Sequence, residues 1–412
     1  MEFKSVSVVG LGYIGLPTAA VIASRGIKVI GVDVSQHAVD TINAGGVHIV
    51  EPDLDIVVRS AVQAGNLKAT TKAEKADVFM VAVPTPFKDN YEADLSYIES
   101  AAKAIAPVLE KGNLVILEST SPVGATEELA NWLAQARPDL TFPQTHGSDA
   151  DINVAHCPER VLPGHVLREL VENDRVIGGM SEACSKKAVS LYKTFVKGEC
   201  LLTNARTAEM AKLTENSFRD VNIAFANELS MICDKLNIDV WELIKLANRH
   251  PRVNILSPGP GVGGHCIAVD PWFIVSSAPD TAKLIRQARE VNDSKPHYVL
   301  KQIVDAAEQF KKPVVACLGI AFKADIDDLR ESPALEITKM LAQKNIAKVL
   351  VVEPNISKLP ESLAALGVEL VSLDSALEQC NTLAVLVDHS SFKAIDPELV
   401  AKKAIVDSRG IF

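Results

Sequence analysis

Apolar residues in the first half of the chain form short runs that alternate with longer amphipathic segments. From residue 5 the sequence reads SVSVVGLGYIGLPTAAVIASRGIKVIGVDVS, which predicts a strand, a tight turn, a helix and a second strand. Further strand-like runs follow at 76–86, 113–122 and 152–161, separated by segments of helical length at 95–109 and 126–136. This alternation predicts a doubly wound parallel α/β sheet over about the first 200 residues, with ligands at the carboxyl ends of its strands.

A different pattern begins at Asn204, where some thirty residues follow without proline or glycine. At 1.5 Å per residue they predict one helix of roughly 45 Å, a length typical of a helix that links two domains or forms an oligomer interface. Strand-like runs return at 312–322, 348–355, 368–373 and 382–390, with a helix at 334–343. We therefore expect an α/β protein with two Rossmann-like, doubly wound parallel-sheet domains, 1–203 and 301–412, joined by a central helical domain, 204–300, that contains the long helix.

Charge and cysteine content narrow the function classes. A formal net charge of −10 over 412 residues argues against a general binder of nucleic acid or anionic membranes, although an acidic protein can still hold a local basic pocket. The seven cysteines include no CxxC pair, so we expect neither a disulfide framework nor a zinc ribbon. This cysteine usage favours a cytoplasmic location. No segment reads as long and apolar enough to span a bilayer.

The first turn has the spacing of a dinucleotide-binding loop. Gly10, Gly12 and Gly15 form GxGxxG directly after the first strand, and Asp33 ends the next strand. The first glycine permits a tight turn, the second lets the backbone approach a pyrophosphate, and the third lets helix and strand pack closely. Asp33 would accept hydrogen bonds from the adenosine ribose and repel a 2′-phosphate, which favours NAD over NADP. The corresponding turn of the later domain, GIAFKADIDD, lacks this spacing, so we assign it no second dinucleotide.

The segment GPGVGGHCIAVD, residues 259–270, places Cys266 in a glycine-rich loop. The four glycines of this loop bring the backbone close to another group, and a thiol at that place is accessible, which favours a nucleophile. Elsewhere cysteine is most often a small buried hydrophobic residue. That interpretation applies to Cys184, Cys233, Cys317 and Cys380.

A metal site is an alternative interpretation of the same loop. Its ligands would be His250, His265, Cys266 and Asp270. Adjacent histidine and cysteine side chains rarely converge on one ion, so we favour the nucleophile and expect no metal.

Polar residues on the long helix and cations in later loops predict a site for an anionic ligand. Lys212, Asn216 and Arg219 are spaced by four and seven positions, so they share one helix face and can meet one ligand. The alternative interpretation of such a polar stripe is a solvated helix surface. For any single cation, the alternative is a surface salt bridge. Arginine suits bidentate contacts to phosphate. The cations near glycine- and proline-rich loops are Arg249, His250, Arg252, Lys323 and Arg330.

A dinucleotide combined with a nucleophilic cysteine predicts an oxidation that continues past the aldehyde. A simple alcohol dehydrogenase needs no thiol, whereas a thiolate that adds to an aldehyde forms a thiohemiacetal that can lose a second hydride. Hydrolysis of the resulting thioester completes the conversion of a primary alcohol to a carboxylate while two NAD are reduced. We expect Lys212 to stabilise the developing oxygen anions with Asn216 as a second donor, and Asp270 to orient or deprotonate the water.

The motifs, taken in order, also carry a family resemblance over essentially the whole chain. They are GxGxxG, PTP at 84–86, STSPVG at 119–124, CPERVLPG at 157–164, AEMAKLTENSFRDVNIAFANE, GPGVGGHCIAVDPWF and FKADIDDLRESP. Together they resemble the nucleotide-sugar 6-dehydrogenases. The resemblance implies NAD as cofactor, a UDP-sugar as substrate, Cys266 as nucleophile, Lys212 as proton donor or acceptor, and a homodimer built through the long central helix.

The resemblance also implies which residues line each ligand. NAD would be lined by Tyr13, Ile14, Asp33, Thr85 and Thr126, joined by Arg330 from the later domain. The sugar nucleotide would meet Arg160, Val161, Asn216, Arg219, His250, Arg252, Gly263, Phe322, Lys323 and Arg409, with Lys212 beside it. The resemblance further implies oxidation of UDP-N-acetyl-D-mannosamine to its uronate, for bacterial surface polysaccharide such as enterobacterial common antigen.

One departure from the family pattern bears on the substrate. UDP-glucose dehydrogenases carry a second acid four positions after the glutamate of their Pro-Glu motif, and here that position is Pro163. UDP-glucose is therefore a weaker expectation. Hydrolysis of the thioester would rely on Glu159, Asp270, Lys212 or water held by Thr120.

Three alternatives remain open at this point. In the first alternative the chemistry is the same, but the substrate is UDP-glucose, UDP-N-acetylglucosamine or UDP-N-acetylgalactosamine. The second is a two-electron dehydrogenase of the β-hydroxyacid type, which needs no cysteine. The third is a non-enzymatic NAD-binding redox sensor that oxidises Cys266 reversibly.

Overall fold

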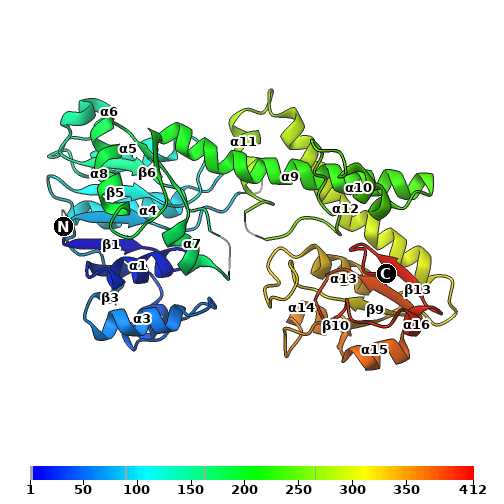
Figure 1. The fold of residues 1–412 in the computed structure, drawn as a ribbon. Coiled ribbons are helices and arrows are strands. Elements are labelled where there is room, and N and C mark those ends of the chain that lie inside the picture. Colours follow the sequence, from blue (N-terminus) through cyan, green and yellow to red (C-terminus); the bar gives the residue numbers. More distant parts are fainter. Residues whose placement is uncertain (1–2, 89–90, 162–163, 265) are drawn as a thin grey trace. The chain divides into compact units, whose positions relative to one another are not determined.

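The computed structural model describes residues 3–88, 91–161, 164–264 and 266–412, and Figure 1 shows its ribbon. The chain divides into two compact units, Met1–Glu215 and Asn216–Phe412. Within the described ranges, no helix has both the length and the apolar character needed to cross a membrane.

Among the described residues, the first unit is built on an eight-stranded sheet with the order β3-β2-β1-β4-β5-β6-β7-β8. Strands β1 to β6 pair in parallel, which confirms the predicted sheet. The end of the sheet was not foreseen, because β7 runs antiparallel to β6 while β8 is parallel to β7. The strands are β1 (Ser5–Val9), β2 (Lys28–Val32), β3 (Leu67–Thr70), β4 (Val78–Val81), β5 (Leu114–Leu117), β6 (Asn153–His156), β7 (Arg175–Gly179) and β8 (Cys200–Asn204).

Apolar side chains cover both faces of this sheet. In β4, Val78 and Met80 belong to one hydrophobic core, while Phe79 and Val81 belong to the other, because alternate residues of a strand point to opposite faces. Helices α1 (Gly15–Ser24), α2 (Gln36–Asn43), α3 (Leu54–Gln63), α7 (Val166–Glu172) and α8 (Glu182–Tyr192) contribute to the first core. Helices α4 (Ser96–Ile105) and α5 (Ala125–Ala136) contribute to the second, near the short η1 (Ala106–Val108), α6 (Pro143–His146) and η2 (Gly147–Asp149).

The predicted long helix is confirmed as α9, which runs without a break over Ala205–Leu236. The helices that follow are α10 (Val240–Ala247), α11 (Asp270–Ser277) and α12 (Lys283–Ala307). A buried polar network joins α9 to α12: Arg289 donates to Asp220 Oδ1 at 2.6 Å, and Asn292 donates to the same oxygen at 2.8 Å. Asn227 in turn donates to Asn292 at 2.9 Å, so this pair of helices is fixed by specific hydrogen bonds as well as by packing.

The second unit ends in a five-stranded parallel sheet, counted over the described residues, with the order β11-β10-β9-β12-β13. The run predicted as a strand at 368–373 forms only a two-residue strand, because β11 lies at the edge and pairs with β10 alone. The strands are β9 (Val314–Leu318), β10 (Lys348–Val352), β11 (Glu369–Leu370), β12 (Thr382–Val385) and β13 (Ala404–Asp407). The helices are α13 (Pro333–Lys344), α14 (Glu361–Ala364), α15 (Leu373–Gln379) and α16 (Pro397–Val400).

Candidate active site

The turn between β1 and α1 shows why glycine is needed at two of its three positions. Gly10 has φ +92°, and a Cβ placed on it would lie 2.6 Å from the carbonyl oxygen of Ala82. A Cβ on Gly15 would lie 1.8 Å from the carbonyl oxygen of Gly10, so α1 packs directly against the turn. Gly12 differs, because no atom of the described residues, apart from its two chain neighbours, lies within 4 Å of the place of its Cβ. The turn therefore leaves open space at the start of α1, as a pyrophosphate requires.

Asp33 follows β2 and faces this turn. Its Oδ2 accepts a hydrogen bond from the backbone N–H of Leu11 at 2.9 Å, and its Oδ1 accepts one from Ser35 at 2.9 Å. The side chain is half-buried. Each carboxylate oxygen keeps further acceptor capacity, so an oriented acid is available for a ribose diol.

Three other residues implied for NAD lie at or near this edge of the sheet. The Tyr13 side chain is exposed. The Thr85 hydroxyl oxygen is buried and has no hydrogen-bond partner within the described part of the chain. The Thr126 hydroxyl donates to Glu209 at 2.6 Å, and the same carboxylate accepts the backbone N–H groups of Gly124 and Thr126 at 2.7 and 2.8 Å. Glu209 of α9 thus holds the start of α5; the motif that contains Glu209 does not indicate this partner.

A buried ionic cluster lies where β5 and β6 end. Glu159 and Arg175 are both buried, with 4.0 Å between Glu159 Oε1 and Arg175 Nη1. Burial raises the pKa of Glu159 above its usual value, while the Lys212 ammonium acts in the opposite direction. Burial likewise raises the pKa of Glu118 to about 8, opposed by Arg175. Sequence reasoning identified Glu159 and Lys212 but missed Glu118 and Arg175, whose electrostatic interaction is visible only in the fold.

Cys266 is the exposed member among the seven cysteines, all of which lie in described ranges. Cys184, Cys233, Cys317 and Cys380 are buried, as predicted. The carbonyl of Cys266 accepts the N–H groups of Val269 and Asp270 at 3.1 and 2.8 Å, which forms the turn that leads into α11. Asp270 is buried and accepts a hydrogen bond from the Asn216 side chain at 2.5 Å. Two of the predicted catalytic residues are therefore directly hydrogen-bonded.

The glycines of the cysteine loop are explained by close packing. Gly259 donates its N–H to Asn227 at 2.9 Å, and a Cβ on it would lie 2.6 Å from Arg409 Nη1. A Cβ on Gly263 would lie 3.0 Å from Phe322 Cβ and 2.4 Å from the carbonyl oxygen of Glu331. Gly263, Phe322 and Arg409, which were predicted to meet one ligand, are therefore gathered around the same loop.

The remaining predicted cations stand in different environments. Arg330 makes a two-oxygen contact with Asp328, with a shortest N–O distance of 2.6 Å, and Arg409 pairs with Asp388. Arg160 pairs with Glu215 at 2.8 Å, next to the half-buried Val161. Arg219, Arg249, His250, Arg252 and Lys323 are exposed. His265 and Pro163 lie outside the described residues.

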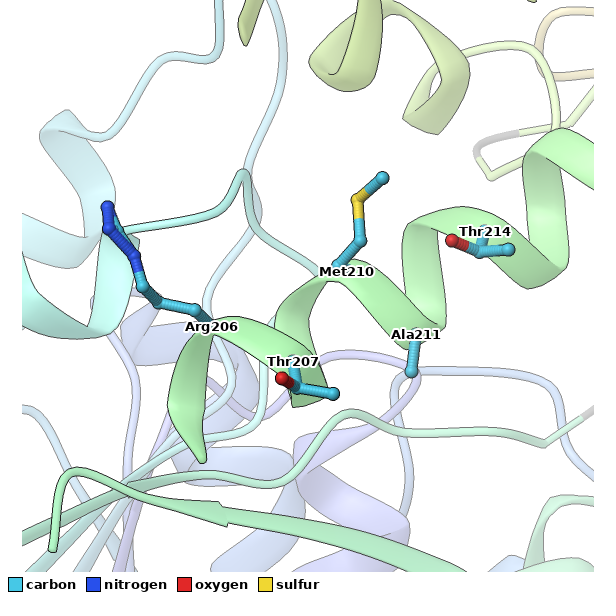
Figure 2. A pocket seen from close by; sticks show the side chains of 5 residues that line it. All are labelled: Arg206, Thr207, Met210, Ala211 and Thr214. Atoms are coloured by element: carbon cyan, nitrogen blue, oxygen red, sulfur yellow. The ribbon is translucent and has the colours of Figure 1, made fainter. Parts of the chain in front are cut away.

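A shallow hollow of about 540 Å³ lies along the first turns of α9 and contains none of the predicted residues. Figure 2 shows its lining, which comes from this one helix: Arg206, Thr207, Met210, Ala211 and Thr214. Over the ranges that the structure describes, no group of three or more histidine, cysteine, aspartate or glutamate side chains is placed to hold a metal ion.

The parallel sheet, the open glycine turn and the oriented Asp33 define a dinucleotide-dependent oxidoreductase. Residues 4–196, 206–294 and 316–412 match the NAD binding, central and UDP binding domains of the UDP-glucose/GDP-mannose dehydrogenase family. The chain belongs to this family, and NAD is its cofactor.

Several known proteins resemble the chain along its full length. The NDP-N-acetyl-D-galactosaminuronic acid dehydrogenase of Ralstonia nicotianae is 64% identical over 412 residues, 100% of this chain and 97% of that protein. The UDP-N-acetyl-D-mannosamine dehydrogenase of Escherichia coli is 61% identical over 420 residues, 100% of both chains. A solved structure of the Pyrococcus horikoshii UDP-N-acetyl-D-mannosamine dehydrogenase has a TM-score of 0.89 at 39% identity and covers 99% of this chain and 96% of that one.

Proposed function

We propose that the protein carries out the four-electron oxidation of UDP-N-acetyl-D-mannosamine to UDP-N-acetyl-D-mannosaminuronate. The observation that carries the proposal is the exposed Cys266, in a turn whose next residues lead to the buried Asp270–Asn216 pair. Relatives at 61–64% identity named UDP-N-acetyl-D-mannosamine dehydrogenase support the choice of sugar.

The proposed chemistry gives separate tasks to Lys212 and Cys266. NAD, which the Gly10–Gly15 turn and Asp33 would hold, would supply the hydride acceptor for each of the two oxidations. Lys212 stabilises the alkoxide of the first oxidation, and Cys266 then adds its sulfur to the aldehyde carbon to form a thiohemiacetal. Loss of the second hydride leaves a thioester on Cys266. Water attacks its carbonyl carbon, the C–S bond breaks, and the carboxylate leaves while the thiol is regenerated.

Asp270 is the residue we favour for positioning the hydrolytic water. It belongs to the same unit as Cys266, its own N–H bonds the Cys266 carbonyl, and Asn216 orients its carboxylate. Glu159 is the competing base, and its raised pKa keeps it protonated to a higher pH than an exposed glutamate. Separate Asp270→Asn and Glu159→Gln variants test this order: accumulation of a Cys266 acyl adduct in mass spectra should follow the first substitution. An adduct seen only with the second would assign hydrolysis to Glu159.

A second sugar is favoured by a specific finding. Two Ralstonia proteins at 63–64% identity are named NDP-N-acetyl-D-galactosaminuronic acid dehydrogenases. The deciding experiment compares turnover of UDP-N-acetylmannosamine, UDP-N-acetylgalactosamine, UDP-N-acetylglucosamine and UDP-glucose, with NADH counted per sugar consumed. We expect two NADH per sugar and the highest kcat/KM with UDP-N-acetylmannosamine. One NADH per sugar would favour the two-electron alternative.

We also propose a homodimer through α9. Phe218, Phe225 and Ile232 are 69%, 54% and 47% exposed and are spaced by seven residues, so they form one apolar stripe of the kind that a second helix covers. Light scattering after size-exclusion chromatography should give twice the chain mass. A Phe225→Glu variant should run as a monomer, whereas a dimer that survives this charge would place the interface elsewhere.

The cellular role and domain division remain proposals as well. The three-part division at 203/204 and 300/301 is supported by the three matched family ranges. A nucleotide-activated uronic acid is a glycosyl donor, which supports a cytoplasmic role in bacterial surface polysaccharide such as enterobacterial common antigen. Loss of the acidic sugar from the surface polysaccharide of a deletion strain is the corresponding test.

A further inference from the structure

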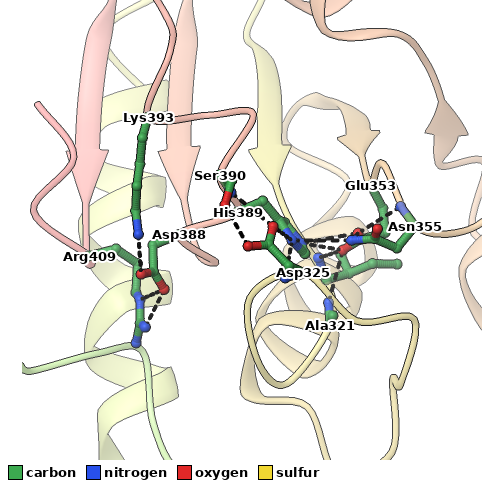
Figure 3. A network of polar contacts seen from close by, with 10 residues as sticks. Ala321, Asp325, Glu353, Asn355, Asp388, His389, Ser390, Lys393 and Arg409 are labelled. Atoms are coloured by element: carbon green, nitrogen blue, oxygen red, sulfur yellow. Dashed lines mark hydrogen bonds and ion pairs between the residues drawn. The ribbon is translucent and has the colours of Figure 1, made fainter. Parts of the chain in front are cut away.

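A buried polar cluster lies beside the carboxyl end of the second sheet, and the proposed chemistry does not use it. We call it the His389 cluster; Figure 3 shows its members Asp325, Glu353, Asn355, His389 and Ser390. The side chains of Glu353 and His389 are completely buried. Burying two ionisable groups is costly unless their polar atoms are paired, so their partners indicate what the cluster holds in place.

Glu353 fixes the turn that follows β9. One of its oxygens, Oε2, accepts the backbone N–H groups of Ile320 and Ala321 at 2.8 and 3.1 Å, and His389 Nε2 lies 3.0 Å from Oε1. Burial opposes ionisation, but hydrogen bonds from His389 and Ile320 keep the pKa of Glu353 below its usual value. The side chain is therefore a carboxylate that pins the start of the 320–325 loop.

His389 and Ser390 pin the other end of this loop. The backbone N–H of Asp325 donates to His389 Nδ1 at 2.9 Å, so the ring proton lies on Nε2, which donates to Glu353. Asp325 has φ +60°, a conformation that residues other than glycine rarely adopt. Its carboxylate accepts the Ser390 N–H at 2.9 Å and the Ser390 hydroxyl at 2.6 Å. Hydrogen bonds at both ends of the loop thus hold a conformation that costs backbone strain.

The pinned loop contacts the cysteine loop. Phe322 lies between the two pinned ends, and its ring atom Cε2 would be 3.2 Å from a Cβ placed on Gly264. Phe322 Cβ would likewise be 3.0 Å from a Cβ on Gly263. Gly264 and Gly263 precede Cys266 by two and three residues. Lys323 stands next to Phe322 and is exposed. A shift of the 320–325 loop would therefore move Lys323, and it would also move Phe322 against the glycines that precede Cys266.

Glu353 has a counterpart in the first sheet, Asp33, but it supports the protein backbone instead of a ligand. Asp33 follows β2, which pairs with β1, and it accepts an N–H group from the turn after β1. Glu353 follows β10, which pairs with β9, and it accepts N–H groups from the turn after β9. Asp33 is half-buried and has acceptor capacity left for a ribose. Glu353 is fully buried against His389, so the acid in the second sheet bonds to the protein and not to a ligand.

We propose that Glu353 and His389 are positioning residues that hold Phe322 and Lys323 for the UDP-sugar and set the shape of the Cys266 loop. The inference deepens the proposed function and rests on it. It assigns no proton transfer to either residue; both act through the backbone of the 320–325 loop.

The test compares Glu353→Gln, His389→Gln and Ser390→Ala with the wild-type enzyme. The glutamine amide in His389→Gln would keep a donor toward Glu353 and lose the acceptor for Asp325, whereas Ser390→Ala removes one exposed hydrogen bond. Thr338→Val is the matched control, because Thr338 is buried in the same sheet domain and donates within its own helix to Ala334. The measurements are KM for the UDP-sugar and for NAD, affinity for UDP alone by calorimetry, and the iodoacetamide alkylation rate of Cys266 by mass spectrometry.

We expect KM for the UDP-sugar and the dissociation constant of UDP to rise about tenfold in the first two variants, the scale of one lost hydrogen bond to a charged group. The alkylation rate of Cys266 should change with them, while KM for NAD stays near the wild-type value. Ser390→Ala should show the same pattern more weakly, and Thr338→Val should match the wild type.

Two results would overturn the inference. One is wild-type UDP affinity and alkylation rate in the folded Glu353 and His389 variants, or in Ser390→Ala if those two do not fold. The other is an equal rise in KM for NAD, or the same defects in Thr338→Val, since either indicates general destabilisation. Measurements of UDP affinity and of the alkylation rate need no turnover. They therefore test the positioning role of Glu353 and His389 even if the wild type fails to produce two NADH per sugar.

Discussion

Gly12 and Gly15 offer a paired test of the dinucleotide turn, because a methyl group at each meets opposite surroundings. We expect Gly15→Ala to damage the fold and Gly12→Ala to damage NAD binding alone. At position 15 the new Cβ would lie 1.8 Å from the Gly10 carbonyl oxygen, a backbone atom that no rotamer change can move. At position 12, among the residues that the structure describes, only its two chain neighbours could lie within 4 Å of it, so it would point into open space near the start of α1.

The magnitudes follow from these contacts. Separating α1 from the turn should cost about 3 kcal/mol, the upper part of the usual range for overpacking. In a unit of this size that cost lowers the melting temperature by about 6–12 °C. A methyl group on Gly12 would block a backbone contact to a charged pyrophosphate, worth about 1.5–3 kcal/mol. The dissociation constant of NAD should then rise by about 10- to 150-fold at an unchanged melting temperature.

Scanning calorimetry and an NAD titration by protein fluorescence measure the two quantities on the same preparations. Each variant serves as the control for the other, since both add one methyl group to the same turn. NAD affinity unchanged in Gly12→Ala would show that the pyrophosphate does not approach this backbone. A Gly15→Ala protein that melts with the wild type would refute the steric argument.

Three further predictions concern single side chains. Asp33→Ser should erode the preference for NAD over NADP, measured as the ratio of the two kcat/KM values; an unaltered ratio would exclude the ribose contact. Lys212→Ala should lower kcat by about two orders of magnitude or more, the scale of a lost acid–base group, and wild-type turnover would remove the lysine from the mechanism. Glu118 holds its proton in the folded chain up to a pKa of about 8 but releases it above 4.5 when unfolded, so its contribution to stability falls as pH rises between these values. The urea midpoint of Glu118→Gln should therefore decline less than that of the wild type from about pH 5.5 to about pH 8, a window set by those two pKa values, and equal declines would contradict the buried neutral acid.

The elements that sequence reasoning predicted well are those decided by local chemistry. The β1–turn–α1 unit follows from Gly10 and Gly15, where a side chain would clash, and α9 follows from thirty residues without a helix breaker. The burial of Cys184, Cys233, Cys317 and Cys380 agrees with the usual behaviour of cysteine as a small buried hydrophobic residue. Asn216 and Asp270, proposed to serve one reaction, were foreseen as members of one site, although not as a direct hydrogen bond.

The features that were missed depend on residues far apart in the chain. Glu209 holds the start of α5 from a helix more than eighty positions later, and Phe322 reaches Gly263 across 59 positions. The direction of β7 depends on how the chain returns to the sheet edge, which periodicity alone does not encode. Each of these features is a tertiary arrangement, and a motif that contains one of the residues does not reveal which distant residue it contacts.

The two sheets use the same acidic position in different ways. In the first sheet, the acid after the second strand orients its turn and still faces a ligand, so that position must remain open. In the second sheet, the equivalent acid bonds to backbone N–H groups, to His389 and to the Asn355 side chain, so ligand contacts are left to the loop that it holds. A substitution at Asp33 should therefore change which cofactor binds, whereas one at Glu353 should change how well the sugar nucleotide and the thiol are held, because only the first acid has acceptor capacity left for a ligand.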